Sequence, residues 1–196
     1  MIPLTKRDFF RAVAVETAKM SWPGSMSRGK SPVIRGETKK VVEAYFSSTF
    51  PLAHLWESTG GIGATFDQWH YERVGELAGA MGPNVCSPNK PWSVAAKFIN
   101  TFLHQLQKYD VFRPIRPFLH LPLDTRIFRA LHQAESDALS KVRPLFRQSP
   151  YRMEYSKHLD IQQALLAFLA EMNCRRGAEF QFNARIDLNL LWVTEE

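Results

Sequence analysis

Residues 91–109 read PWSVAAKFINTFLHQLQKY and form the strongest helical pattern in the chain. The large apolar residues recur at a spacing of four, at Val94, Phe98, Phe102 and Leu106. This spacing places them on one side of an α-helix, which is typical of a helix that buries one face in a core. Pro91 suits the first turn of such a helix, because a proline there loses no hydrogen bond.

Prolines, glycines and apolar spacing divide the rest of the chain into further helices. We expect helical segments at about 7–19, 41–46, 66–77, 91–109, 124–142, 160–173 and 183–193. Asp124 is well placed to cap the fifth of these at its N-terminus. No segment shows convincing β-alternation, and the sequence contains neither a repeat nor a linker. The pattern predicts an all-α fold, with residues 1–196 forming a single compact domain of six or seven helices.

Composition limits the classes of function. The 196 residues carry a formal net charge of +6, which favours an anionic partner such as nucleic acid. Two cysteines, Cys86 and Cys174, are too few for a four-thiolate cluster and do not indicate a secreted disulfide scaffold. Charged residues interrupt the N-terminal 20 residues, and no apolar stretch approaches the length of a membrane span. We therefore expect a cytoplasmic protein without membrane contact; the oligomeric state is left open.

Residues 21–36 are rich in proline, glycine and serine and predict a mobile basic loop. Within it, residues 24–31 (GSMSRGKS) match the letters of a phosphate-binding P-loop, but no buried strand precedes them and Pro32 follows. A nucleotide site is therefore disfavoured, and the open alternatives are contact with a phosphate backbone and an ordinary surface loop. The candidate contacts are Arg28, Lys30 and Arg35, with Trp22 as the candidate for stacking on a base.

Lys97 and Asp124 are the residue types that nucleophilic attack on a sugar requires. A neutral lysine amine can attack, and a carboxylate can stabilise positive charge that develops on the sugar. The alternative is a solvated lysine and a simple helix cap, because Lys97 shares its side of the helix with polar residues. These are Asn100, Thr101, His104 and Lys108.

The segment around Asp124 also carries a family resemblance. Residues 123–129 (LDTRIFR) lie close to the V-D-T-H-I-F-R string of the helix-hairpin-helix DNA glycosylases, and Lys97 precedes Asp124 by 27 residues. Residues 185–192 (RIDLNLLW) are similar to the ending of small proteins with the same pairing. The resemblance is distant, to endonuclease III and to archaeal 8-oxoguanine glycosylases. It implies that Lys97 is the nucleophile and Asp124 its activator, although the L-P-G-x-G hairpin signature is absent.

Arginines interleaved with phenylalanines make residues 110–148 strongly cationic. A nucleic-acid surface there would use Arg113, Arg116, Arg126 and Arg129, and the alternative is a solvated surface. No two histidines share the spacing of metal ligands on one segment, so we expect no metal and no cofactor.

The leading hypothesis is a DNA-binding protein of glycosylase type, with a base-excising glycosylase/lyase activity. The alternative is a non-catalytic helical module of mobile-element origin that binds nucleic acid or protein.

Overall fold

The computed structural model describes residues 6–22, 26, 32–57, 62–176 and 182–192. These residues contain seven α-helices and no β-strand; one isolated bridge joins Ile34 to Val85. The α-helices are α1 (Lys6–Met20), α2 (Thr38–Ala44), α3 (Leu52–Glu57), α4 (Phe66–Met81), α5 (Pro91–Leu106), α6 (Thr125–Gln133) and α7 (Tyr155–Arg176). Shorter 3-10 or π turns are η2 (Tyr45–Thr49), η3 (Ile62–Thr65), η4 (Gly82–Asn84), η5 (Asp110–Phe118), η6 (Arg143–Arg147), η7 (Pro150–Arg152) and η8 (Arg185–Trp192). The predicted all-α, single-domain fold is confirmed.

Helix α5 is the central helix of the N-terminal part, as its apolar spacing predicts. Its four predicted core residues are all completely buried. Phe102 stacks on Phe46 with ring centroids 4.0 Å apart and ring planes 5° from parallel. Packed rings of this size bury large apolar areas, so this contact is a major source of stability for the N-terminal helices.

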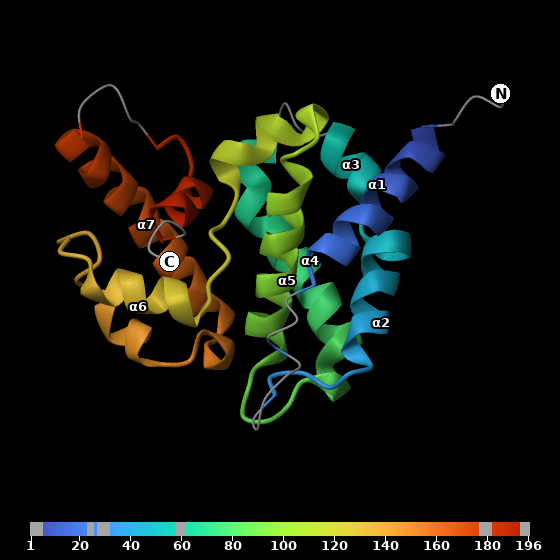
Figure 1. The fold of residues 1–196 in the computed structure, drawn as a ribbon, viewed down its shortest axis with the longest axis horizontal. Coiled ribbons are helices and arrows are strands. Elements are labelled where there is room, and N and C mark those ends of the chain that lie inside the picture. The colour runs from blue at the N-terminus through green and yellow to red at the C-terminus, as the bar shows by residue number, and fades with distance from the viewer. Residues whose placement is uncertain (1–5, 23–25, 27–31, 58–61, 177–181, 193–196) are drawn as a thin grey trace.

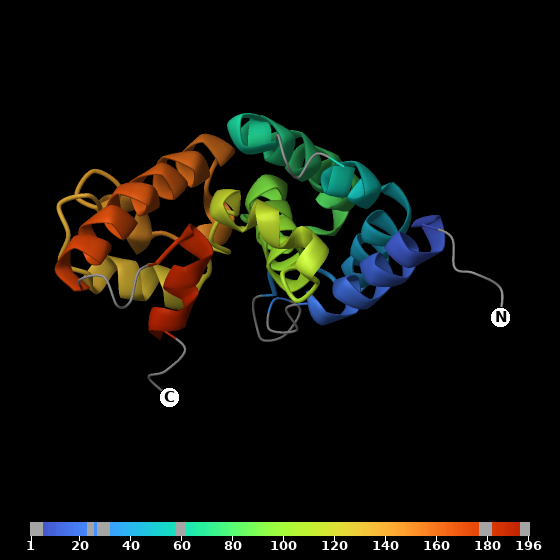
Figure 2. The same cartoon turned by 90° about the horizontal axis from the view of Figure 1, so that it is seen from above.

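The buried apolar residues form two clusters. The first is built mainly by α1–α5 and η5, and the second by α6, η6 and α7. Figure 1 shows the corresponding groups of helices on the right and left, and Figure 2 shows them side by side from above. We call them the N-terminal group and the C-terminal group.

The boundary between the two groups is polar. Within the described residues the chain passes between the clusters several times, and three of the passages are at 119–121, 155–161 and 186–188. A buried polar side chain lies at each of these three passages, namely His120, His158 and Asp187. The two groups therefore meet through hydrogen bonds and ion pairs as well as through apolar packing.

Three differences from the sequence-based expectation lie in the C-terminal part of the chain. Helix α6 ends at Gln133 instead of about 142, and Arg143 donates to the carbonyls of His132 and Ser136, which holds the chain in a non-helical path. The segment expected to be α-helical at 183–193 is the 3-10 helix η8. Helix α7 begins five residues before the expected Asp160, at Tyr155, and so includes His158.

Within the described residues, no helix is both long enough and apolar enough to cross a membrane.

Candidate functional site

The structure brings Lys97 and Asp124 into direct contact. The Lys97 Nζ atom donates a hydrogen bond to Asp124 Oδ2 at 2.9 Å, although 27 residues separate the two along the chain. The Lys97 side chain is 12% exposed and that of Asp124 28%. The pair is thus largely shielded from solvent, while the carboxylate keeps an open side.

Asp124 has a second role, at the start of α6. Its backbone is extended, with φ −143° and ψ 179°, and its Oδ1 atom accepts a hydrogen bond from the Ile127 amide at 2.9 Å. The predicted N-cap is therefore confirmed. One carboxylate oxygen holds the helix and the other holds the lysine, so both oxygens are fixed in position.

The alternative of a solvated Lys97 is wrong, although Lys108, which the helical spacing placed on the same side, is exposed. Lys97 is mostly buried and Asn100 is only 1% exposed. Along this side, Ser93 donates to the Met153 carbonyl, Lys97 to Asp124, and Asn100 Oδ1 lies 2.7 Å from a ring nitrogen of His70. Periodicity along α5 distinguishes apolar from polar faces, but the part of the polar face around Lys97 and Asn100 is also covered, because it lies at the boundary between the two groups.

The surroundings keep Asp124 ionised. Burial alone would raise the pKa of Asp124, but the Lys97 ammonium, the Ile127 amide and the nearby Arg126 together lower it below its ordinary value. Burial, with a contribution from the Asp124 charge, raises the pKa of Tyr151 to about 12. An ionised carboxylate therefore lies beside a neutral phenol and an ammonium group.

The four arginines predicted to bind nucleic acid have different surroundings. Arg126 and Arg129 are exposed on α6 and form no ion pair within the described residues. Arg113 is exposed and pairs with Asp110 at 2.9 Å, and Arg116 pairs with the buried Asp187. Arg126 and Arg129 are thus the two of the four whose charges are not neutralised by a carboxylate of this part of the chain.

The basic loop is described only in part. Arg28 and Lys30 lie outside the described residues, as does most of the P-loop-like segment, whereas Arg35 is exposed. Met26 and Ile34 are buried at 2% and 1% exposure. Both apolar side chains join the core of the N-terminal group, so the loop contacts the core at these two positions.

Trp22, the candidate for base stacking, packs within the protein. Its ring stacks on Phe98 with centroids 5.5 Å apart and 28° between the planes, and it is half-buried. One face of the indole is therefore already covered by the protein.

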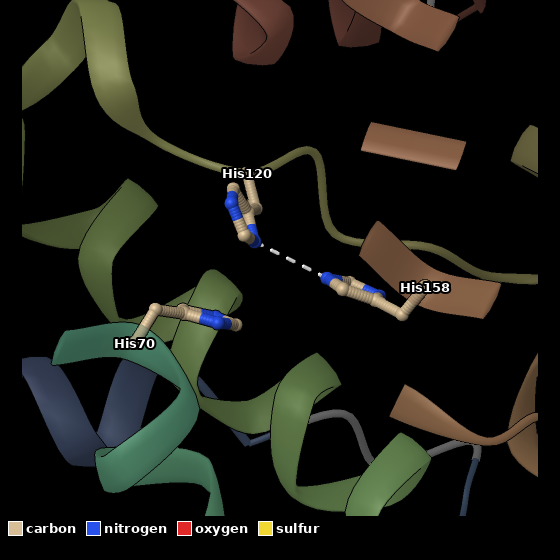
Figure 3. A group of neighbouring side chains, drawn as sticks. All are labelled: His70, His120 and His158. Atoms are coloured by element: carbon tan, nitrogen blue, oxygen red, sulfur yellow. Dashed lines mark hydrogen bonds between the residues drawn. The ribbon is translucent and has the colours of Figure 1, made fainter. Parts of the chain in front are cut away.

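The spacing of the histidines did not reveal a cluster that the fold creates. His70 of α4, His120 of the 119–124 connection and His158 of α7 are all buried, and one ring nitrogen from each lies within 4.8 Å of the others. Figure 3 shows the three rings converging. Since each histidine comes from a different segment, no local sequence motif could have indicated the group.

Each ring of this histidine cluster has hydrogen-bond partners. His120 Nδ1 lies 3.2 Å from His158 Nε2, and His120 Nε2 lies 2.8 Å from Asp67 Oδ1. His70 Nδ1 lies 2.7 Å from the Tyr155 hydroxyl. Burial lowers the pKa of His70 to about 4 and that of the other two histidines well below the ordinary range, so all three rings are neutral near pH 7.

The outer partners of the cluster reach the surface. Asp67 and Tyr155 line a pocket of about 630 Å³, together with Tyr71, Trp92 and Glu154. The Tyr71 and Trp92 rings are stacked with centroids 5.0 Å apart. The pocket thus offers aromatic surface and two carboxylates on the side of the histidine cluster that faces solvent.

Comparison with known proteins does not place the chain in a family: no family model matches it, and neither a curated protein nor a solved structure shows significant similarity.

Proposed function

We propose that the protein binds DNA and acts as a base-excising glycosylase/lyase of the helix-hairpin-helix type. The observation that carries this proposal is the contact between Lys97 Nζ and Asp124 Oδ2 at 2.9 Å. The distant resemblance around residues 123–129 implies the same two residues. The contact adds support that the resemblance by itself lacks, because a catalytic pair must be adjacent in space.

In the proposed reaction the Lys97 ammonium transfers a proton to Asp124, and the neutral amine attacks the sugar C1′ of a flipped nucleotide. The new bond forms between Nζ and C1′, and the electron pair of the glycosidic bond leaves with the base. The C1′–O4′ bond of the sugar ring then breaks, one proton moves from Nζ to O4′, and a protonated imine between Lys97 and C1′ remains. The hydrogen bond between the pair defines the path of the first proton. Asp124 then passes this proton to the departing base, and the carboxylate that it becomes again stabilises positive charge on the sugar.

Charge near the pair supports a DNA partner. Arg126 and Arg129 are exposed on the helix that Asp124 caps, and neither pairs with a carboxylate in the described structure. Cations beside the reacting groups are suited to hold phosphates on either side of a flipped nucleotide. The overall charge of +6 acts in the same direction at longer range.

The proposal is tested by trapping the imine. Purified protein is incubated with duplexes that each contain one damaged base or an abasic site, sodium borohydride is added, and covalent adducts are counted on denaturing gels. We expect an adduct with at least one lesion, its loss in Lys97→Ala, and a rate at least ~100-fold lower in Asp124→Asn, the range over which positioned proton-transfer groups act.

Lys90→Ala is the matched control, because Lys90 is an exposed lysine at the start of the same helix. Its adduct yield should equal that of the wild type. The absence of an adduct with every lesion, or an adduct that persists in Lys97→Ala, would contradict the proposed chemistry.

The second candidate function is a non-catalytic nucleic-acid-binding module, which the exposed charges of Arg126 and Arg129 would serve equally well. In that case the Lys97–Asp124 pair only joins the two groups of helices. DNA binding without an adduct, weakened by salt and by replacement of both arginines, would favour this function.

A further inference from the structure

The histidine cluster formed by His70, His120 and His158 is not used by the proposed reaction. All three rings are buried, and they come from the N-terminal group, the connection and the C-terminal group respectively. Neutral imidazoles are good ligands for zinc and for neighbouring transition metals. We propose that these three histidines bind one divalent transition-metal ion, and that this ion is Zn²⁺.

The spacing of the nitrogens fits such an ion. Zinc–nitrogen bonds of about 2.0–2.1 Å in a tetrahedral arrangement place two ligand nitrogens roughly 3.3 Å apart. His120 Nδ1 and His158 Nε2 are already 3.2 Å apart. With every separation in the set at or below 4.8 Å, the His70 nitrogen needs to approach by at most roughly 1.5 Å, a movement that side-chain rotation can supply.

Asp67 prepares His120 for coordination. A carboxylate only accepts hydrogen bonds, so the 2.8 Å contact with Asp67 Oδ1 places the His120 proton on Nε2. The lone pair of Nδ1 is then directed toward His158. A carboxylate behind a ligating histidine is a common second partner in zinc sites, because it fixes the tautomer and makes the ring a better donor.

Two charged side chains, Arg185 and Asp67, act on the histidine cluster. The buried Arg185 is a fixed positive charge that acts on all three rings, and its guanidinium donates to the carbonyls of Phe118 and Leu119. Asp67 supplies the opposing negative charge. The Tyr155 hydroxyl lies 2.7 Å from His70 Nδ1 and Asn100 Oδ1 lies 2.7 Å from His70 Nε2, so the His70 ring exchanges one of these hydrogen bonds for the bond to the ion.

A bound ion would link three segments that are distant in sequence. His70 is fixed by α4, His158 by α7, and His120 by the chain that joins the two groups. The buried Asn100 also belongs to this region, and its Nδ2 atom has no hydrogen-bond partner among the described residues. We therefore assign the ion a structural role, in which it fixes how the two groups of helices are placed.

The proposal is tested by metal binding alone. Protein without a histidine tag is stripped with a chelator, titrated with Co²⁺ while visible absorption is recorded, and analysed for bound zinc after reconstitution and dialysis. We expect one equivalent of metal per chain and the visible bands of four-coordinate Co²⁺. His120→Asn and His158→Asn should each abolish stoichiometric binding, with circular dichroism used to check folding.

Asp67→Asn keeps the test decisive if the buried variants do not fold. The Asp67 side chain is 51% exposed, so the substitution leaves the core intact, yet it removes the carboxylate behind His120. We expect a 10- to 100-fold weaker metal affinity. The control is His54→Asn, which changes an exposed histidine outside the cluster and should bind like the wild type.

Two results would overturn the assignment. One is wild-type protein that takes up less than a tenth of an equivalent of either metal, which would leave the cluster as a hydrogen-bonded network only. The other is an affinity that Asp67→Asn and His120→Asn leave unchanged. Lys97 and Asp124 are not among the ligands, so failure of the borohydride experiment would not bear on this one.

Discussion

Two substitutions of Asp124 distinguish its role as the N-cap of α6 from its role as the ion-pair partner of Lys97. Asp124→Ala removes the N-cap of α6, which costs about 1 kcal/mol, and the partner of Lys97. Removal of one member of a fully buried ion pair lowers the free energy of unfolding by about 3–5 kcal/mol. Asp124 is 28% exposed, so water replaces part of the interaction, and we expect a loss of about 1–2 kcal/mol for this pair. The free energy of unfolding should therefore fall by about 2–3 kcal/mol. Asp124→Asn keeps an equally good cap and should cost only the pair, about 1–2 kcal/mol.

The assay is urea unfolding at 25 °C, followed by circular dichroism, for wild type, both Asp124 variants, Lys97→Met and the double variant Lys97→Met/Asp124→Asn. The double-mutant cycle should give a coupling energy of about 1–2 kcal/mol. The folded protein lowers the pKa of Asp124, so the carboxylate stabilises the fold above the unfolded pKa of about 3.9 and loses this contribution as the pH falls through the folded value. The difference between wild type and Asp124→Asn should therefore shrink below about pH 4.

Equal stability losses in Asp124→Ala and Asp124→Asn would refute the separate role of the cap. A coupling energy near zero would show that Lys97 and Asp124 do not interact in solution as they do in the structure. It would also remove the geometric support for the proposed reaction.

Three further predictions concern the fold. Phe102→Ala removes a ring that is fully buried and stacked on Phe46, so we expect a loss of about 3–5 kcal/mol in urea unfolding, and a loss below about 1 kcal/mol would contradict the packing of α5. A Cβ at Gly63 would lie 2.5 Å from the Phe118 ring, whereas one at Gly79 meets nothing within 4 Å. In thermal unfolding Gly63→Ala should therefore destabilise by about 1–3 kcal/mol and Gly79→Ala, inside α4, should stabilise by about 0.5–1 kcal/mol; the reverse order would be inconsistent with these contacts. Arg185→Ala leaves the carbonyls of Phe118 and Leu119 without a buried donor and should cost at least about 1–3 kcal/mol, and an unchanged midpoint of unfolding would show that water replaces the guanidinium.

The features that the sequence determined by itself are local. The apolar spacing of α5 requires only neighbours three or four residues apart, and prolines end helices through their own geometry. The cap at Asp124 is likewise set by the backbone of the next three residues. These signals were sufficient for the all-α class, for the position of α5 and for the start of α6. They were insufficient for the end of α6, where side-chain contacts of Arg143 hold the chain away from the helical path.

Only the tertiary structure decided what the polar groups meet. From the sequence, Lys97 could be either solvated or paired with Asp124. Periodicity shows which residues share a face of a helix, but it does not show which part of the protein covers that face. Contact with Asp124 follows from the placement of the C-terminal group against α5. The histidine cluster depends on the tertiary structure still more strongly, since its members come from three segments and gather where the two apolar clusters meet. Burial at this boundary forces each polar side chain to find a partner, and those partners are fixed by packing over long sequence distances.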